Sequence, residues 1–274
     1  MEQVDAKVRL KNTLRPLYHG LYRLRVRTVC RYLDCVEGLF GPEKELPVPP
    51  ALLRFRVAED ANLTRFVEIG RLSAERIEAA LAGIGRTVGD FGTALDFGCG
   101  CGRTLRWLMP RFPGTRFSGT DVDGEAVSWC QKHLQGGDFR TSAPQPPLGF
   151  PPKNFDFIFA ISVFTHLDAA AHEEWVPELA RVLKPGGILL ATFHGPAAWE
   201  HLTGQPREQI EKDRFLFATS RKLRGIVPEW YHTAYHTPDY VRDLLSRRFE
   251  LLDYVQGGFG YQDIALARRP LDLP

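Results

Sequence analysis

The chain has 274 residues, of which 44% are hydrophobic and 11% aromatic, and its 35 Lys and Arg nearly balance its 33 Asp and Glu. This composition excludes collagen-like, low-complexity and wholly disordered chains. The length suits one globular domain with an appendage, with a core large enough to need neither disulfides nor a structural metal.

The cysteines argue against a disulfide framework and against a zinc site. There are five of them, an odd number, and none forms a CxxC pair. Cys99 and Cys101 have no second pair of ligands nearby, so we expect no metal. The first residues are polar and acidic, and no apolar run approaches the roughly 18 residues of a membrane span. We therefore expect a cytoplasmic protein.

Residues 1–46 are predicted to form a basic helical arm. Eight Lys or Arg and no acid lie between residues 7 and 31, which gives this segment a charge of +8 and leaves −6 for the remainder. Leucines recur there at helical spacing, so the arm suits an acidic membrane surface, an acidic partner or a nucleic-acid backbone. Alternatively, the leucines pack on this subunit or a second one while the bases stay in solvent. The segment is then either one helical arm or a pair of helices broken near Pro16, and the prolines from 42 to 50 are predicted to end it.

Residues 47–274 are predicted to form one α/β domain. Leu52–Val57 is expected to be extended or irregular, and Ser73 to cap an amphipathic helix that ends at Gly83 and Gly85. Apolar strands then alternate with helices. The strands are expected at 94–97, 115–121, 138–142, 155–161 and 188–193, and the helices near 105–109, 124–134 and 169–183. This alternation predicts a doubly wound, mostly parallel sheet with helices on both faces.

The C-terminal part of the chain has a different pattern. Residues 195–236 are polar, aromatic and weakly periodic, which is typical of an insert, and we expect a lid over a substrate. Thr237 and Pro238 predict the capped start of a helix. The segments 249–255 and 261–267 then predict an antiparallel hairpin that turns at Gly257 and Gly258.

The sequence Asp96-Phe97-Gly98-Cys99-Gly100-Cys101-Gly102-Arg103 joins a predicted strand to a predicted helix. Its glycines allow a tight turn, and the N–H groups at the helix start suit an anionic group. Asp121 ends the next strand, where a carboxylate can accept hydrogen bonds from both hydroxyls of a ribose. A ribose-bearing cofactor is therefore predicted. Arg103 stands where the nicotinamide fingerprint requires its third glycine, which argues against a nicotinamide oxidoreductase.

At these motifs the chain resembles the class I S-adenosylmethionine-dependent methyltransferases, over about residues 52–268. Four blocks agree in order with the family's motifs: 95–102, 119–123, 154–167 and 183–187. A weaker resemblance, at 235–238 and 257–263, is to a bacterial subgroup often associated with glycan and secondary-metabolite clusters. The resemblance implies a Rossmann-like sheet and S-adenosyl-L-methionine as the cofactor.

The resemblance also implies roles for particular residues. Asp96, Gly98 and Gly100 would surround the methionine part of the cofactor, Asp121 would hold the ribose, and Val122 would pack on the adenine. Cys99 and Ser162 lie within the matched motifs and join this cofactor-binding set. The acid that many members carry after the third strand is absent at Ser142 and Ala143. Arg56 and Arg103 are candidate partners of the cofactor carboxylate, because a guanidinium pairs with it in a bidentate way.

Methyl transfer needs alignment above all, and a general base only where the acceptor must lose a proton. His166 follows the fourth predicted strand and His194 ends the fifth, so both are candidate bases, with His166 preferred. The aromatic side chains expected to wall an acceptor pocket are Phe164, Trp199, Trp230, Tyr231 and Tyr235.

The predicted function is methyl transfer to oxygen or nitrogen of a small molecule or sugar. Two alternatives remain open: a methyltransferase that acts on a protein or nucleic acid through the basic arm, and a catalytically silent cofactor-binding scaffold. The net negative charge of the chain outside the arm, and the lack of an aromatic motif that could stack on bases, argue against a nucleic-acid substrate. The arm leaves a peripheral membrane or protein contact open, and the oligomeric state is not predicted.

Overall fold

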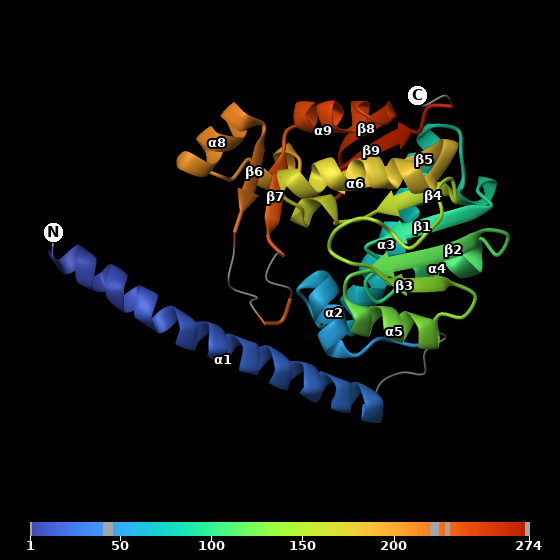
Figure 1. Ribbon diagram of the computed structural model, residues 1–274. Helices are drawn as coiled ribbons and strands as arrows, with labels where there is room; N and C mark the ends of the chain where they lie inside the picture. Colours follow the sequence, from blue (N-terminus) through green and yellow to red (C-terminus); the bar gives the residue numbers. More distant parts are fainter. Residues whose placement is uncertain (1, 41–45, 220–224, 228–230, 272–274) are drawn as a thin grey trace.

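The computed structural model describes residues 2–40, 46–219, 225–227 and 231–271, and it describes the side chains of the first helix from residue 16 to residue 38 (Figure 1). The strands are β1 (Thr93–Phe97), β2 (Arg116–Asp121), β3 (Asp138–Thr141), β4 (Phe155–Ala160), β5 (Leu183–Phe193), β6 (Phe215–Ala218), β7 (Thr233–His236), β8 (Glu250–Phe259) and β9 (Gln262–Arg268). The α-helices are α1 (Glu2–Phe40), α2 (Ala51–Ala58), α3 (Leu63–Gly83), α4 (Leu105–Arg111), α5 (Gly124–His133), α6 (Ala169–Val182), α7 (Pro196–Trp199), α8 (Gln205–Asp213) and α9 (Pro238–Ser246). Two short 3₁₀ turns are η1 (Val88–Asp90) and η2 (Phe164–His166).

Seven strands form the main sheet, in the order β3-β2-β1-β4-β5-β9-β8. The first five of these strands pair in parallel, and β9 pairs antiparallel with both β5 and β8. The predicted α/β class, with a mostly parallel sheet and an antiparallel C-terminal hairpin, is confirmed. The order reverses between β1 and β4, and ligands of open α/β sheets bind at the carboxyl ends of strands at such a point.

Both faces of the sheet are apolar and covered, which explains why its strands read as continuous hydrophobic runs. Side chains alternate along each strand, so in β4 Phe157 and Phe159 pack in the core cluster with α3, α4 and α5, whereas Ile158 and Ala160 pack in the cluster with α6 and α9. The two clusters fix the sheet and with it the strand ends that carry the candidate site.

The segment expected to be extended after the proline-rich stretch is the helix α2. Its Arg54 side chain is only 1% exposed. The guanidinium donates from Nε to Ala61 O, from Nη1 to Pro49 O and from Nη2 to Glu37 of α1, at 2.8–2.9 Å. Because eight residues are too few to show a helical period, these tertiary partners, absent from the local pattern, decide the conformation.

The helix predicted to start at Ser73 begins ten residues earlier, at Leu63. Asn62 is its N-cap and accepts a hydrogen bond from Arg65 N at 2.9 Å. Ser73 lies inside the helix, where its hydroxyl donates to Ile69 O. Serine can satisfy itself in this way within a helix, so its presence alone did not mark the start. The expected end at Gly83 is confirmed.

The arm is one helix, α1, that continues through Pro16, so the alternative of two helices broken near Pro16 is wrong. Proline removes one backbone hydrogen bond, but its fixed φ of about −65° is helical, and the helix tolerates the loss here. In Figure 1, α1 runs past the domain, and its N-terminal part extends away from it. Among the residues that the structure describes, no helix is long and apolar enough to cross a membrane.

The insert contains α7, α8 and a small sheet in which β6 and β7 pair antiparallel. Residues 220–224 and 228–230, within the insert, lie outside the described residues. The C-terminal hairpin turns between Phe259 and Gln262, not at the predicted glycines. Gly257 and Gly258 instead lie inside β8 at a register shift, where Gly257 has a φ of +63° and donates to Asp263. Glycines mark bulges as well as turns, which explains the error.

Candidate functional site

A cavity opens at the carboxyl ends of β1, β2 and β4, where the sheet order reverses. The residues that line it come from positions 56 to 231 of the chain. They are Arg56, Val57, Asp96, Phe97, Gly98, Cys99, Gly100, Arg103, Thr104, Thr120, Asp121, Val122, Asp123, Ala126, Ser142, Pro144, Ile161, Ser162, Val163, His166, Leu167, Trp175, Val227 and Tyr231. Every residue predicted to bind the cofactor lies in this wall.

The glycine turn after β1 approaches its neighbours too closely for side chains. Gly98 has a φ of +84° and Gly100 a φ of +51°, a region that only glycine occupies at little cost. A Cβ atom on Gly98 would collide with Val163, and one on Gly100 would lie 2.7 Å from Cγ2 of Val57. The turn therefore exposes backbone rather than side chains to the cavity.

Asp121 ends β2 and points its carboxylate at this turn. Oδ2 accepts a hydrogen bond from Gly100 N at 2.7 Å, and Oδ1 accepts one from Asp123 N at 2.8 Å. Burial raises the pKa of Asp121, and these backbone hydrogen bonds oppose the rise. Each carboxylate oxygen has a second lone pair, so the group can still accept hydrogen bonds from a ligand.

Asp96, at the end of β1, is a second buried carboxylate in the same wall. Its side chain is almost fully buried, and burial raises its pKa well above the ordinary value. The charge of Asp121 raises it further, while Arg103 opposes the rise. Two neighbouring carboxylates in a poorly solvated wall favour a cationic ligand, which would relieve their repulsion.

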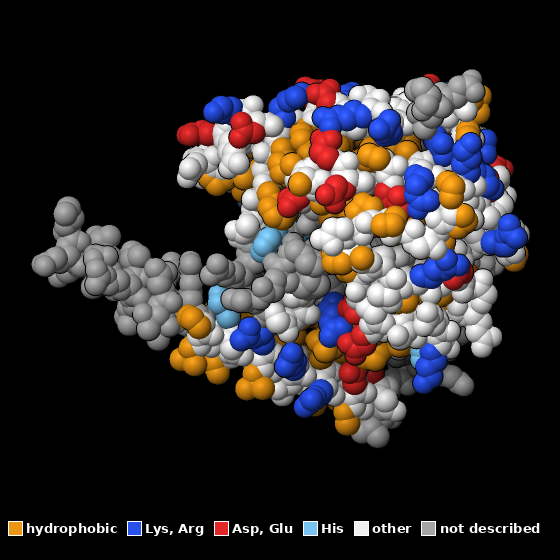
Figure 2. Space-filling model, in the orientation of Figure 1, with side chains coloured by type: hydrophobic (Ala, Val, Ile, Leu, Met, Phe, Trp, Pro, Cys, Tyr) orange, Lys and Arg blue, Asp and Glu red, His pale blue; other side chains and the backbone are white. Residues whose placement is uncertain are grey.

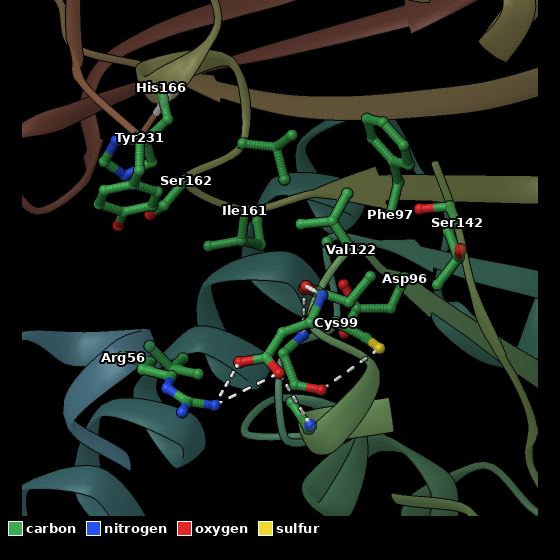
Figure 3. A pocket seen from close by; sticks show the side chains of 18 of the residues that line it. Arg56, Asp96, Phe97, Cys99, Val122, Ser142, Ile161, Ser162, His166 and Tyr231 are labelled. Atoms are coloured by element: carbon green, nitrogen blue, oxygen red, sulfur yellow. Dashed lines mark hydrogen bonds and ion pairs between the residues drawn. The ribbon is translucent and has the colours of Figure 1, made fainter. Parts of the chain in front are cut away.

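The two arginines predicted to face a carboxylate differ in their partners. Arg103 lines the cavity, and its Nε is buried with no hydrogen-bond partner among the described residues. Arg56 also lines the cavity, but its Nη1 lies 3.1 Å from Asp123 and 2.7 Å from Glu125. Arg56 thus ties α2 to the start of α5 (Figure 3). Arg103 makes a longer contact, from Nη1 to Val57 O at 3.5 Å, and the Nε of Arg56 is also buried without a partner among the described residues.

Cys99 sits inside the turn as a small buried side chain. Its Sγ contacts the carbonyl of Gly100 at 3.6 Å, and the neighbouring Cys130 and burial raise the pKa of its thiol. A raised pKa keeps the thiol protonated and unreactive. Among the described residues, no group of three His, Cys, Asp or Glu is placed to hold a metal ion.

The two ends of the cavity differ in character. Figure 3 shows His166, Tyr231 and Ser162 at one end and Phe97 and Ser142 at the other. Ser162 has a φ of +58°, which is uncommon outside glycine. Its backbone N–H donates to Thr192 Oγ1 at 2.8 Å, and its hydroxyl lies 2.9 Å from Nε2 of Gln262 in β9. These contacts hold the chain after β4 in a bend at the cavity wall.

His166 follows β4 in η2. Its Nδ1 lies 2.6 Å from the carbonyl oxygen of His232, and its ring stacks on Tyr231 with centroids 3.9 Å apart. Because a carbonyl only accepts, Nδ1 carries the proton and Nε2 keeps a lone pair. Burial lowers the pKa of His166 to about 4, so the ring is neutral near pH 7 and can accept a proton.

His194 is not among the residues that line the cavity. It is 7% exposed, its Nδ1 lies 3.0 Å from Ala234 O, and its ring centroid is 6.4 Å from that of His166. The position at the end of β5 suggested a place beside the acceptor. However, the imidazole contacts the carbonyl oxygen of Ala234 in β7 instead of lining the cavity. His194 therefore lies next to His166 but outside the cavity wall.

Of the aromatic residues expected to wall an acceptor pocket, Tyr231 does so. Trp199 packs in a separate cluster of the insert, Tyr235 lies beside it, and Phe164 belongs to the core beneath α6. Trp230 lies outside the described residues. The side chains that sequence reasoning missed are Val57, Leu167, Trp175 and Val227. Leu167 ends the matched block 154–167 but was given no role, and the other three lie outside the matched blocks, so tertiary folding alone brings them to the wall.

Three buried histidines predict a stability that falls in acid. Burial lowers the pKa of His166, His172 and His194 to about 4 each. Unfolded histidine has a pKa of about 6.5, so below that value the unfolded chain binds protons that the folded chain does not. The free energy of unfolding should therefore fall between pH 6.5 and pH 4, by on the order of 1–3 kcal/mol for each histidine. Urea unfolding across this range measures it.

His172 provides the test of this assignment, since it is fully buried and bonded to Tyr240 and Phe164 O. His172→Gln should lower stability at pH 7 and flatten the slope between pH 6.5 and pH 5. His201→Gln, at an exposed position, is the matched control and should leave the slope unchanged. An equal slope in the His172 variant and the wild type would contradict the assignment.

Comparison with known proteins identifies a methyltransferase domain in the chain. Residues 95–191 match a family model described as a methyltransferase domain. The fatty-acid O-methyltransferase of Mycolicibacterium smegmatis is 29% identical over 136 residues, 47% of this chain and 48% of that protein. The trans-aconitate 2-methyltransferase of Rhodopseudomonas palustris is 30% identical over 192 residues, 59% of this chain and 66% of that protein. The chain thus spans about half to two thirds of these curated relatives.

The fold of the chain is also that of a methyltransferase. A SAM-dependent methyltransferase structure from Methanosarcina mazei superposes with a TM-score of 0.51 at 20% identity, covering 66% of this chain and 93% of that one. The glycine turn and Asp121 lie within the residues that match the domain model. The chain therefore carries a methyltransferase domain at residues 95–191 and has the Rossmann-like fold of class I S-adenosylmethionine-dependent methyltransferases, whose cofactor is S-adenosylmethionine.

Proposed function

We propose that the protein is an enzyme that transfers a methyl group from S-adenosylmethionine to an oxygen or nitrogen atom of a small-molecule or sugar acceptor. The observation that carries this proposal is one continuous cavity. It joins a carboxylate suited to a ribose, Asp121, to a neutral histidine suited to an acceptor, His166.

The residues around the glycine turn fit the cofactor. When bound, S-adenosylmethionine supplies an electrophilic methyl group on a positively charged sulfur. Asp121 keeps lone pairs for the ribose hydroxyls, and Asp96 suits the ammonium group. The unpartnered Nε of Arg103 suits the cofactor carboxylate. Val122 and Ser142 line the cavity beyond Asp121 and suit the adenine.

The acceptor side supports a small molecule. Leu167, next to His166 in the chain, and Tyr231, which stacks on its ring, give this part of the cavity apolar and aromatic surface, and Val227 packs with Tyr231. Among the described residues of the wall, His166 is the one histidine, and its unprotonated Nε2 can accept a proton from the acceptor. The names of the relatives, fatty-acid O-methyltransferase and trans-aconitate 2-methyltransferase, also favour an oxygen acceptor.

The test has two stages. Calorimetry with S-adenosylmethionine, S-adenosylhomocysteine and NADH should show that the first two bind and that the third does not. The protein is then incubated with methyl-tritiated S-adenosylmethionine and panels of organic acids, sugars and hydroxylated small molecules. Acceptor-dependent formation of S-adenosylhomocysteine is the expected result. Binding of NADH alone would contradict the cofactor, and methylation confined to protein or nucleic acid would contradict the acceptor class.

A further inference from the structure

The side of α1 that faces away from the domain is apolar and uncovered. Leu17, Leu21, Leu24 and Tyr32 are each 60–66% exposed. Residues 17, 21 and 24 follow a spacing of four and three, which places them on one face of a helix, and residue 32 continues that face. Monomeric proteins rarely expose large apolar side chains in such a row, so a partner is expected to cover them.

The opposite side of α1 is already occupied. Val26 and Cys30 are buried in a cluster with Ala51 and Phe55 of α2 and with Val227 of the insert. Arg27 donates from Nη2 to Gly225 O at 3.3 Å. The domain therefore holds α1 by one face only, and fixes the exposed leucines in an outward position.

Positive charge flanks the exposed leucines. Arg25, Arg27 and Arg31 are exposed, and no acidic residue occurs between residues 7 and 31. The acids that follow face the domain, since Asp34 accepts from Ala51 N and Glu37 pairs with Arg54. Figure 2 shows hydrophobic side chains of α1 beside Lys and Arg along this edge of the molecule.

We propose that this face of α1, defined by Leu17, Leu21, Leu24 and Tyr32 with their flanking arginines, docks on a bilayer surface rich in anionic lipid. An interfacial helix combines leucines that enter the headgroup region with Lys and Arg that meet anionic headgroups. A second copy of α1 would bring two segments of charge +8 together without an acid between them, and like charges across an interface are repulsive. Charge complementarity therefore selects the lipid surface. The inference is independent of the acceptor.

Vesicle flotation with the full chain tests the proposal. Vesicles of phosphatidylcholine mixed with phosphatidylglycerol should bind the protein at low salt, and pure phosphatidylcholine should bind it much less. Binding should weaken as salt rises, since the screening length falls from about 10 Å at 0.1 M to about 3 Å at 1 M. Leu17→Gln with Leu21→Gln and Leu24→Gln, and separately Arg25→Glu with Arg31→Glu, should each weaken it at least about tenfold.

The matched control is Arg116→Glu with Arg248→Glu, at two exposed arginines of the domain, which should change vesicle binding by less than about twofold. Circular dichroism confirms that all variants are folded. Failure of the wild type to bind anionic vesicles at low salt would overturn the proposal, as would equal binding to neutral vesicles. A dimer in sedimentation equilibrium that the leucine substitutions dissociate would instead assign the face to a second copy.

Discussion

Asp121→Asn is expected to weaken S-adenosylmethionine binding by about 30- to 150-fold. The carboxylate accepts hydrogen bonds from Gly100 N and Asp123 N, and we propose that it also holds the ribose. An amide keeps one acceptor oxygen and turns the other position into a donor that faces a backbone N–H. Loss of hydrogen bonds to a charged group costs roughly 2–3 kcal/mol, which corresponds to the stated loss of affinity. Calorimetry measures it.

The control for this prediction is Asp138→Asn. Asp138 begins β3, is exposed and pairs with Arg140, so it should change cofactor affinity by less than about twofold. Melting temperatures of both variants separate loss of fold from loss of binding. If Asp121→Asn melts like the wild type and still binds the cofactor as tightly, then the carboxylate does not hold the ribose.

His166→Gln is expected to lower turnover by about 100- to 10,000-fold while S-adenosylmethionine affinity stays nearly unchanged. Removal of a positioned general base has this magnitude. The carbonyl of His232 fixes the proton on Nδ1, so Nε2 is the atom that accepts the acceptor proton. Steady-state rates with the acceptor found in the screen, together with calorimetry of the cofactor, measure the two effects separately.

The pH profile distinguishes a base from a structural histidine. Because the pKa of His166 is lowered to about 4, the ring stays neutral on acidification, and turnover should hold well below pH 6.5 before it falls. His194→Gln is the matched control, since the pKa of His194 is also about 4 but it lies outside the cavity wall. It should lower stability and change turnover by less than about tenfold. Full turnover in His166→Gln would indicate an acceptor that is already ionised, such as a carboxylate, and would end the role of His166 as a base.

Much of the cofactor half of the site could be predicted from the sequence because its chemistry is local. The turn between β1 and α4 needs glycine where φ is positive, as at Gly98 and Gly100. These glycines are close together in the sequence, so the turn can be recognised from a short segment. Asp121 ends the next strand, and parallel strands bring their carboxyl ends to one edge of the sheet. Spacing alone therefore placed the carboxylate beside the turn.

The acceptor half could not be predicted in this way. Val227 and Tyr231 come from the insert, and neither belongs to a motif. His194 follows its strand in the sequence pattern as His166 does. However, its imidazole contacts Ala234 of β7 and does not line the cavity. Arg56 was expected to be available, but Asp123 and Glu125 contact its guanidinium from across the turn. Such partners depend on side-chain directions that only packing sets.

The sequence by itself determined the alternating α/β order, the glycine turn and the charge of the arm, because these depend on periodicity, backbone freedom and composition along the chain. Tertiary structure alone decided that residues 51–58 are helical and which face of α1 remains exposed. In each case contacts between residues far apart outweigh weak local preferences: Arg54 bonds to Glu37, and Val26 packs in one cluster with Val227. A short segment's own propensity is worth less than the burial and hydrogen bonds that distant partners supply.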